Sequence, residues 1–373
     1  MTETIGVVGL GTMGLGIAQV FAQAGLTVLA TDAIPAARAS AHDRLKAALA
    51  PRVAKGAMTQ AESDAILSRL VIVEAPAQLA PAQLVVEAIV EDIGIKRALV
   101  ADLEQVLAPD AVIATNTSSL PVSEIAAGAS HPERVVGLHF FNPAPVMRLV
   151  ELVPHAGTAP AALATARRLT ELAGKVVIDA PDRPGFIVNR CARPFYGEAL
   201  ALLEEGRSPA QIDAAMVAAG YRLGPFSLID LIGADINLAA TEGLSRAMGG
   251  HPRYHVFDRL QQQVASGNLG RKTGQGFLFP NPPGPAPADA EAIVQRIDAT
   301  LVNEALWLLS EGGTTAAGID TALKLGLNFP RGPFEILASL GPDRIRATLA
   351  ALDARAPAHL ASRYRPAPAL EQS

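Results

Sequence analysis

Residues 5–32, IGVVGLGTMGLGIAQVFAQAGLTVLATD, decide the architecture of the first half of the chain. Residues 5–8 are an apolar run that predicts a strand, and the segment GLGTMG, residues 9–14, follows at once. An amphipathic helix is expected to continue to Gly25, and a second apolar strand over residues 27–31 ends at Asp32. Strand, glycine-rich turn, helix, strand and acid in this order predict a parallel α/β sheet.

The glycines of this turn suit a dinucleotide. Gly9, Gly11 and Gly14 allow a tight turn and let a pyrophosphate approach the backbone at the helix N-terminus. Asp32, eighteen residues after Gly14, can accept hydrogen bonds from ribose hydroxyls and would repel a 2′-phosphate. The stretch therefore predicts a Rossmann-type site that takes NAD rather than NADP; the alternative is an incidental glycine-rich turn.

Length and composition narrow the class of protein. The 373 residues suggest two or three domains, and 50% hydrophobic against 18% charged residues allows a large core. A net charge of −5 with dispersed Lys and Arg argues against nucleic acid as a partner. The single cysteine, Cys191, excludes an internal disulfide, and we see no cluster with metal-ligand spacing. No apolar run approaches ~18 residues, so we expect no membrane span and a cytoplasmic protein.

Polar residues follow the later strands of the first half. Residues 71–73, 84–89 and 111–115 read as strands, and Glu91 and Lys96 come after the second of them. Asn116 and Ser118 stand just beyond the third, where open α/β sheets bind ligands. Small polar side chains there can hold a hydroxyl or a nicotinamide amide. The alternative is a helix cap before residues 121–127.

Residues 138–151, LHFFNPAPVMRLVE, carry the predicted chemistry. Residues 138–141 and 146–153 read as two strands around a turn at residues 142–145, so His139 and Glu151 are expected to face each other. A carboxylate opposite an imidazole fixes its tautomer and makes the far nitrogen a better base. The alternative is a buried structural histidine with a glutamate at its rim.

With residues 182–190, DRPGFIVNR, and 270–277, GRKTGQGF, these segments resemble the L-3-hydroxyacyl-CoA dehydrogenase family over residues 4–280. The resemblance implies NAD-dependent interconversion of (S)-3-hydroxyacyl-CoA and 3-oxoacyl-CoA, with an acyl-CoA as the partner molecule. It also implies a Rossmann-type domain followed by an all-α domain. Two alternatives remain: a dehydrogenase of the same architecture acting on a sugar acid without coenzyme A, and a non-catalytic NAD-binding structural protein.

The resemblance also implies roles for individual residues. His139 would be the catalytic base and Glu151 its orienting partner, while Ser118 and Asn189 would hold the substrate's 3-oxygen. The residues expected at the cofactor, beyond Gly9, Gly11, Gly14 and Asp32, are Glu91, Lys96, Asn116, Asn142 and Lys272. Lys55 matches a lysine that binds the phosphates of coenzyme A.

An internal repeat organises the second half. IVNR at residues 187–190 recurs as IVQR at 293–296, and GPF at 224–226 recurs as GPF at 332–334. We therefore expect a nucleotide domain over residues 1–183, a helical domain over 184–280 and a degenerate second copy over 288–360. Asn189 is replaced by Gln295 in that copy, so the second copy is interpreted as structural.

The fused copy bears on assembly. In single-copy relatives the helical domain is a dimerisation surface, so the chain is expected to be either a monomer with an internal pseudo-dimer or a homodimer.

Residues 193–200, RPFYGEAL, resemble relatives that act on dicarboxylic substrates such as 3-hydroxyadipyl-CoA. Arg193 could pair with a distal carboxylate, but we favour a helix-surface arginine. The Pro- and Ala-rich tail, residues 355–373, is expected to be partly disordered.

Overall fold

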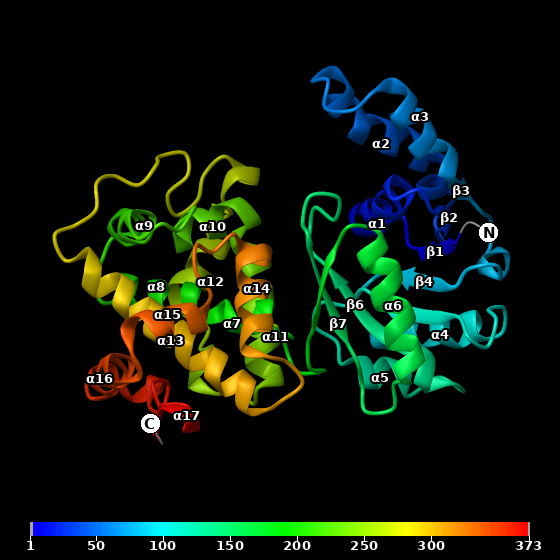
Figure 1. The fold of residues 1–373 in the computed structure, drawn as a ribbon. Helices are drawn as coiled ribbons and strands as arrows, with labels where there is room; N and C mark the ends of the chain where they lie inside the picture. Colours follow the sequence, from blue (N-terminus) through cyan, green and yellow to red (C-terminus); the bar gives the residue numbers. More distant parts are fainter. Residues whose placement is uncertain (1–2, 372–373) are drawn as a thin grey trace. The chain divides into compact units, whose positions relative to one another are not determined.

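The structure, a computed structural model, describes residues 3–371 and divides into two compact units at residues 183 and 184 (Figure 1). Within these residues the first unit holds one sheet of eight strands in the order β3-β2-β1-β4-β5-β6-β7-β8. Neighbouring strands are parallel except β6 and β7, which are antiparallel. The strands are β1 Thr4–Val8, β2 Thr27–Thr31, β3 Leu70–Ile72, β4 Leu84–Glu87, β5 Val112–Thr115, β6 Val135–Phe140, β7 Leu149–Val153 and β8 Val176–Asp179. The expected Rossmann-type fold is confirmed.

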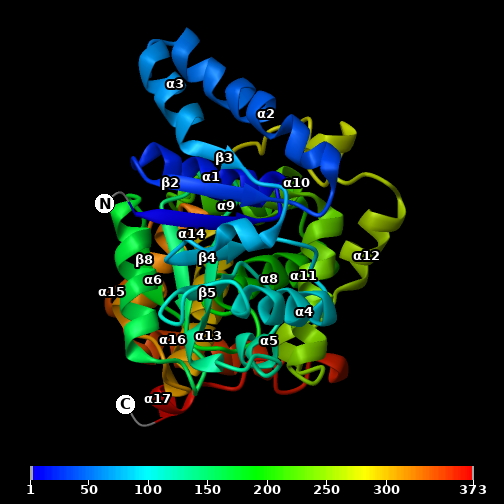
Figure 2. The same ribbon diagram turned by 90° about the vertical axis from the view of Figure 1, so that its right-hand side faces the viewer.

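Helices cover both faces of this sheet. One core packs α1, α2 and α6 against the sheet and includes Ile17, Leu45 and Leu169; the other packs α4 and α5 and includes Val100 and Ile125. Because both faces are buried, the strands read as apolar runs in the sequence. The hairpin of α2 and α3 extends away from the sheet beyond β3 (Figure 2). The helices are α1 Thr12–Gln23, α2 Pro35–Ala54, α3 Gln60–Arg69, α4 Ile93–Glu104, α5 Val122–Ala126 and α6 Pro160–Leu172.

The second unit is helical throughout its regular structure. A long helix, α13, packs against α8 and α9 of the first repeat and against α15 and α16 of its own. Several of these helices begin at a proline, whose missing N–H costs nothing in a first turn. The helices are α7 Val188–Cys191, α8 Arg193–Glu204, α9 Pro209–Ala218, α10 Pro225–Ile232, α11 Ala234–Ala247, α12 Asp258–Ala265, α13 Ala290–Ser310, α14 Ala316–Leu327, α15 Pro333–Leu340, α16 Pro342–Asp353 and α17 Pro368–Glu371. Among residues 3–371, no helix has both the length and the apolar character that crossing a bilayer requires.

Matching residues of the two repeats make matching contacts. Asp213 accepts a hydrogen bond from the Phe226 backbone N–H at 2.9 Å, and Asp320 accepts one from the Phe334 N–H at 2.8 Å. Each aspartate lies on the helix before the GPF segment and holds the start of the next helix, α10 or α15. The start of the helix after the GPF segment is therefore held in the same way at both places.

The repeats also exchange ion pairs. Arg190 Nε of the first repeat donates to Glu304 Oε1 of the second at 2.7 Å. Arg296 Nε of the second repeat donates to Glu198 Oε2 of the first at 2.9 Å. Both arginines and both glutamates are separated by the same offset of 106 residues. The arginine of each copy thus pairs with the glutamate of the other copy. Reciprocal contacts of this kind are the pattern of an isologous dimer interface.

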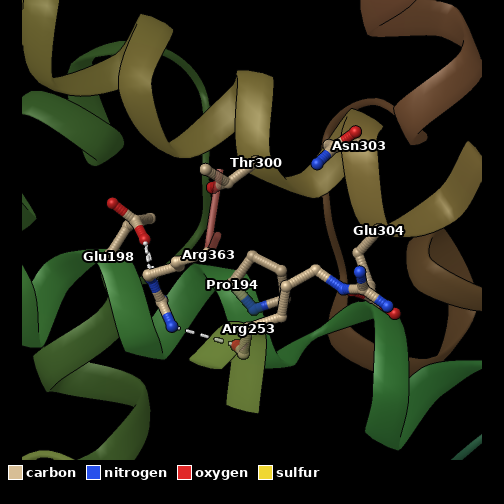
Figure 3. Close-up of a pocket in the computed structure, with 7 residues that line it drawn as sticks. All are labelled: Pro194, Glu198, Arg253, Thr300, Asn303, Glu304 and Arg363. Atoms are coloured by element: carbon tan, nitrogen blue, oxygen red, sulfur yellow. Dashed lines mark hydrogen bonds and ion pairs between the residues drawn. The ribbon is translucent and has the colours of Figure 1, made fainter. Parts of the chain in front are cut away.

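A second pair of arginines completes this network. Arg253 Nε donates to Glu304 Oε2 at 3.0 Å, and Arg363 Nε donates to Glu198 Oε1 at 2.8 Å. Figure 3 shows these four side chains around Pro194, with Arg363 also reaching the Arg253 backbone carbonyl. Arg363 and Tyr364 are 4% and 3% exposed. The expectation of a partly disordered tail is wrong for this segment, because these two side chains anchor it in the core.

Candidate active site

The glycine-rich turn joins β1 to α1. Gly9 has φ +94°, in the left-handed region that favours glycine, and its N–H donates to the Thr31 carbonyl at 2.9 Å. A Cβ on Gly14 would lie 1.8 Å from the Gly9 carbonyl oxygen, so strand and helix could not approach with any larger residue. A Cβ on Gly11 would meet nothing within 4 Å, so the fold itself does not require that glycine. Open space at Gly11, beside a helix N-terminus that no side chain among residues 3–371 caps, fits a pyrophosphate.

Asp32 stands at the end of β2 beside this turn. Its Oδ2 accepts a hydrogen bond from the Leu10 N–H at 2.6 Å, and its Oδ1 accepts one from the Ile34 N–H at 2.8 Å. These bonds hold the carboxylate next to the turn, where the ribose of a bound dinucleotide is expected. The arrangement fits an NAD site, because a 2′-phosphate would meet this negative charge.

A buried ion cluster lies at the ends of β4 and β5. Lys96 is 1% exposed, and its Nζ donates to both oxygens of Glu87 at 2.9 Å and lies 3.3 Å from Glu91 Oε2. Burial opposes the charge on Glu91, but hydrogen bonds from Thr117 and the charge of Lys96 outweigh it and lower the pKa of Glu91. Its Oε1 accepts from the Thr117 hydroxyl at 2.7 Å and from the Ser118 N–H at 2.9 Å. Lys96 and Glu91 therefore shape the loop that carries Ser118.

Asn116 links β5 to the strand that carries the histidine. Its Oδ1 accepts a hydrogen bond from the Phe140 N–H at 2.8 Å, one residue after His139. A hydrogen bond thus joins the polar segment after β5 to the end of β6, where His139 lies. The alternative of a Ser or Thr cap before residues 121–127 is wrong: α5 begins after Pro121 without a side-chain cap, and the Val122 and Ser123 N–H groups donate to Asp182 instead.

His139 and Glu151 are direct partners in the β6–β7 register, as their spacing predicted. His139 Nδ1 lies 2.7 Å from Glu151 Oε2, and the two side chains are 7% and 0% exposed. A buried carboxylate accepts the proton of Nδ1, which leaves the basic lone pair on Nε2. The histidine lies near the carboxyl end of β6, at the same edge of the sheet as the glycine turn. This is the geometry of an oriented general base.

The loop after His139 is held by a lysine that the sequence did not single out. Lys175, just before β8, is 9% exposed and donates to the carbonyls of Ala144 at 2.6 Å and Met147 at 2.7 Å. Burial lowers the pKa of its ammonium to about 8. The sequence shows only that Lys175 directly precedes an apolar strand. That position does not indicate which backbone carbonyls its side chain reaches.

We expect Lys175→Met to change how stability depends on pH. An unfolded lysine titrates near ~10.4, so between pH ~8 and ~10.4 the folded chain has released a proton that the unfolded chain still binds. Rising pH therefore favours the folded wild-type chain across that window, and the variant lacks this gain. The urea midpoint of wild type minus that of the variant should therefore increase from pH 7 to 10; a constant difference would contradict the shift.

The remaining predicted residues belong to other segments of the chain. Asn142 is exposed in the β6–β7 loop, and Lys55 is exposed at the end of α2. Asn189 lies on α7 of the second unit. Lys272, also in the second unit, donates to both carboxylate oxygens of Asp235 at 2.5 and 2.6 Å. The roles of these four residues stay predictions.

Comparison with known proteins identifies the family. The model of the 3-hydroxyacyl-CoA dehydrogenase NAD-binding domain matches residues 4–183, and that of the family's C-terminal domain matches residues 185–279 and 293–373. A 3-hydroxyadipyl-CoA dehydrogenase of Escherichia coli is 44% identical over 74% of this chain, which spans 58% of that relative's length. A 3-hydroxybutyryl-CoA dehydrogenase of Mycobacterium tuberculosis is 39% identical over 74% of this chain and 97% of its own length.

Similarity to a solved structure extends over both helical repeats. The crystal structure of 3-hydroxybutyryl-CoA dehydrogenase from Escherichia coli K12 covers 100% of this chain, and the chain covers 98% of it. The two share 34% sequence identity with a TM-score of 0.91. The resemblance drawn from the sequence is thereby confirmed, and the chain belongs to the 3-hydroxyacyl-CoA dehydrogenase family, with an NAD-binding first domain.

Proposed function

We propose that this chain interconverts (S)-3-hydroxyacyl-CoA and 3-oxoacyl-CoA, with NAD as the redox partner and His139 as the general base. The observation that carries the proposal is the 2.7 Å contact between His139 Nδ1 and Glu151, at the sheet edge that also bears the glycine turn. In its bound state, NAD supplies the hydride acceptor. Gly9, Gly11 and Gly14 would hold its pyrophosphate and Asp32 its ribose. Glu91, Lys96, Asn116, Asn142 and Lys272 are the further residues proposed to serve the cofactor.

The chain's own residues handle the proton and the charge. His139 Nε2 accepts the proton of the substrate's 3-hydroxyl, and Glu151 stabilises the imidazolium that results. Negative charge that builds on the 3-oxygen is met by neutral donors, for which we propose Ser118 and Asn189. In the reverse direction His139 returns the proton, so one residue serves both directions. Lys55 is proposed to meet a phosphate of coenzyme A.

Turnover of three substrates with NADH and with NADPH tests the proposal. We expect oxidation of NADH with acetoacetyl-CoA or 3-oxoadipyl-CoA, weaker use of NADPH because of Asp32, and no reaction with a free keto acid. Turnover of the free acid alone would move the chain to the sugar-acid alternative. If no substrate is turned over while NAD still binds, the non-catalytic alternative would be favoured.

We also propose that the chain is a monomer in solution. The matching ion pairs of Arg190 with Glu304 and of Arg296 with Glu198 join the two repeats as a dimer interface would join two chains. We expect a mass near that of one chain, 38.7 kDa, from light scattering after gel filtration. A dimer that persists on dilution would contradict the internal pseudo-dimer.

A further inference from the structure

Arg193 is a buried cation whose partners are all uncharged. It opens α8, is 8% exposed, and donates through Nε to the Asn189 carbonyl and through Nη1 to the Thr241 hydroxyl, both at 3.0 Å. Its guanidinium lies 4.8 Å from the centre of the Tyr196 ring. Within residues 3–371 no carboxylate pairs with it. The expectation of a helix-surface arginine is therefore wrong.

The neighbouring Arg190 shows what a structural arginine looks like in the same segment. It is 0% exposed and pairs with Glu304 at 2.7 Å and with Glu311 at 2.6 Å. Burial disfavours its charge, yet the two glutamates raise the pKa of Arg190. Burial lowers the pKa of Arg193, because no such carboxylate offsets it. A buried charge left without a counter-ion destabilises a fold. The presence of an arginine at position 193 is therefore better explained by function than by stability.

The internal repeat provides a control for this difference. The position of Arg190 keeps its arginine in the second copy, as Arg296, and the ion pair is kept with it. The position of Arg193, 106 residues further on, is Ala299. The copy that we interpret as structural thus retains the paired arginine and has lost the unpaired one.

The surroundings of Arg193 change together with it. Thr241, which accepts its hydrogen bond, corresponds to Leu349 at the offset of 108 residues that relates this part of the repeats. Asn237, one turn before Thr241, corresponds to Ile345. Ile345, Leu349 and Ala299 belong to one apolar core of the second copy. The fold is therefore able to fill this place with hydrocarbon, and the polar set in the first copy is not needed for packing.

A further polar atom in the first copy lacks a partner. Asn237 is 3% exposed, and its Oδ1 is buried with no hydrogen bond among the described residues. The Thr241 hydroxyl accepts from Arg193 and donates to the Asn237 backbone carbonyl at 2.7 Å. Turning the Asn237 amide over would present its NH₂ group instead. Among the described residues, the first copy thus holds a buried cation without a carboxylate and a buried amide oxygen without a hydrogen bond.

We propose that Arg193 determines substrate specificity by binding a carboxylate at the far end of the acyl chain, so that the preferred substrates are thioesters of dicarboxylic acids. The proposal rests on the proposed function, in which Asn189 holds the 3-oxygen. Arg193 contacts the Asn189 backbone directly. In an adipyl chain the distal carboxylate is three carbon–carbon bonds of about 1.5 Å each from the reacting carbon. Arg193 follows Asn189 by four residues, so a group near the 3-oxygen and a group at the chain end can come from the same segment. A planar guanidinium binds a carboxylate in two parallel hydrogen bonds.

The test compares 3-oxoadipyl-CoA with acetoacetyl-CoA in wild type and in Arg193→Met. Wild type should prefer the dicarboxylic thioester in kcat/KM. The variant should lower the ratio of the two kcat/KM values by ~10²–10³-fold, because the carboxylate would then be buried without its partner. Arg193→Lys, which keeps the charge without the planar fork, should recover part of the ratio. An unchanged ratio in Arg193→Met would overturn the proposal.

Two further measurements separate a role of Arg193 in specificity from a purely structural role: the melting temperature of the variants and the substrate preference of the wild type. Replacing an unpaired buried cation by Met should leave the melting temperature unchanged or raise it, whereas Arg190→Met in the same segment should lower it. A wild-type preference for acetoacetyl-CoA would overturn the inference without any variant and leave the proposed function standing. Absence of turnover with both thioesters would instead reject the proposed function.

Discussion

Replacing His139 by Gln is expected to lower kcat for reduction of the 3-oxoacyl thioester by ~10²–10⁴-fold, the range for loss of general acid–base catalysis. A glutamine amide can still donate to Glu151, so the buried carboxylate keeps a partner and the fold is expected to hold. The amide cannot exchange a proton near neutral pH, so it cannot give the proton that the 3-oxygen takes up during reduction. Steady-state kinetics with NADH and the thioester that wild type turns over measures the effect.

NAD affinity serves as the control for this variant. Because Gly9, Gly11 and Asp32 lie on other strands and turns, NADH binding measured by fluorescence should change little. A matched loss of NADH binding and of kcat would mean that His139 maintains the fold of the site and is not its base. A companion variant, Glu151→Gln, should retain more activity than His139→Gln, because it disturbs orientation and leaves the imidazole in place.

Arg190→Met is expected to destabilise the second unit by about 3–5 kcal/mol. The arginine is fully buried, and its loss leaves Glu304, which is 1% exposed, with one fewer counter-charge. Arg296→Met should cost a similar amount, since it occupies the matching place opposite Glu198. Urea unfolding followed through Trp307, the single tryptophan of the chain, reports on this unit, because Trp307 lies on α13.

A surface ion pair of the same unit provides the matched control. Arg207 pairs with Asp289 between side chains that are 38% and 44% exposed. Solvent screens such a pair, so Arg207→Met should cost much less stability than Arg190→Met. Equal costs for Arg190→Met and Arg207→Met would show that the exchange of ion pairs between the repeats contributes little to stability.

Much of the site could be predicted because its determinants are local. The turn from Gly9 to Gly14 and the acid at Asp32 follow from backbone sterics and from strand order, and both are written in consecutive residues. The pairing of His139 with Glu151 follows from equal spacing about one turn, since an antiparallel register carries each residue to a definite partner. The repeat could also be recognised from the sequence, because the same short motifs recur at a nearly constant spacing.

What the sequence alone determined is therefore the Rossmann-type fold, the resemblance to a dehydrogenase family, the histidine–glutamate pair and the recurrence of motifs in the second half. Only the tertiary structure decided how Lys175 ties the loop after His139 and that the two repeats exchange their arginines. It also decided that Arg193 is buried with no carboxylate beside it among residues 3–371. These facts depend on which groups meet across 31 to 114 residues of chain, as Lys175 meets Ala144 and Arg190 meets Glu304. Helical periodicity does not identify such partners, because α8 is buried on most of its surface and no polar face marks the direction of Arg193.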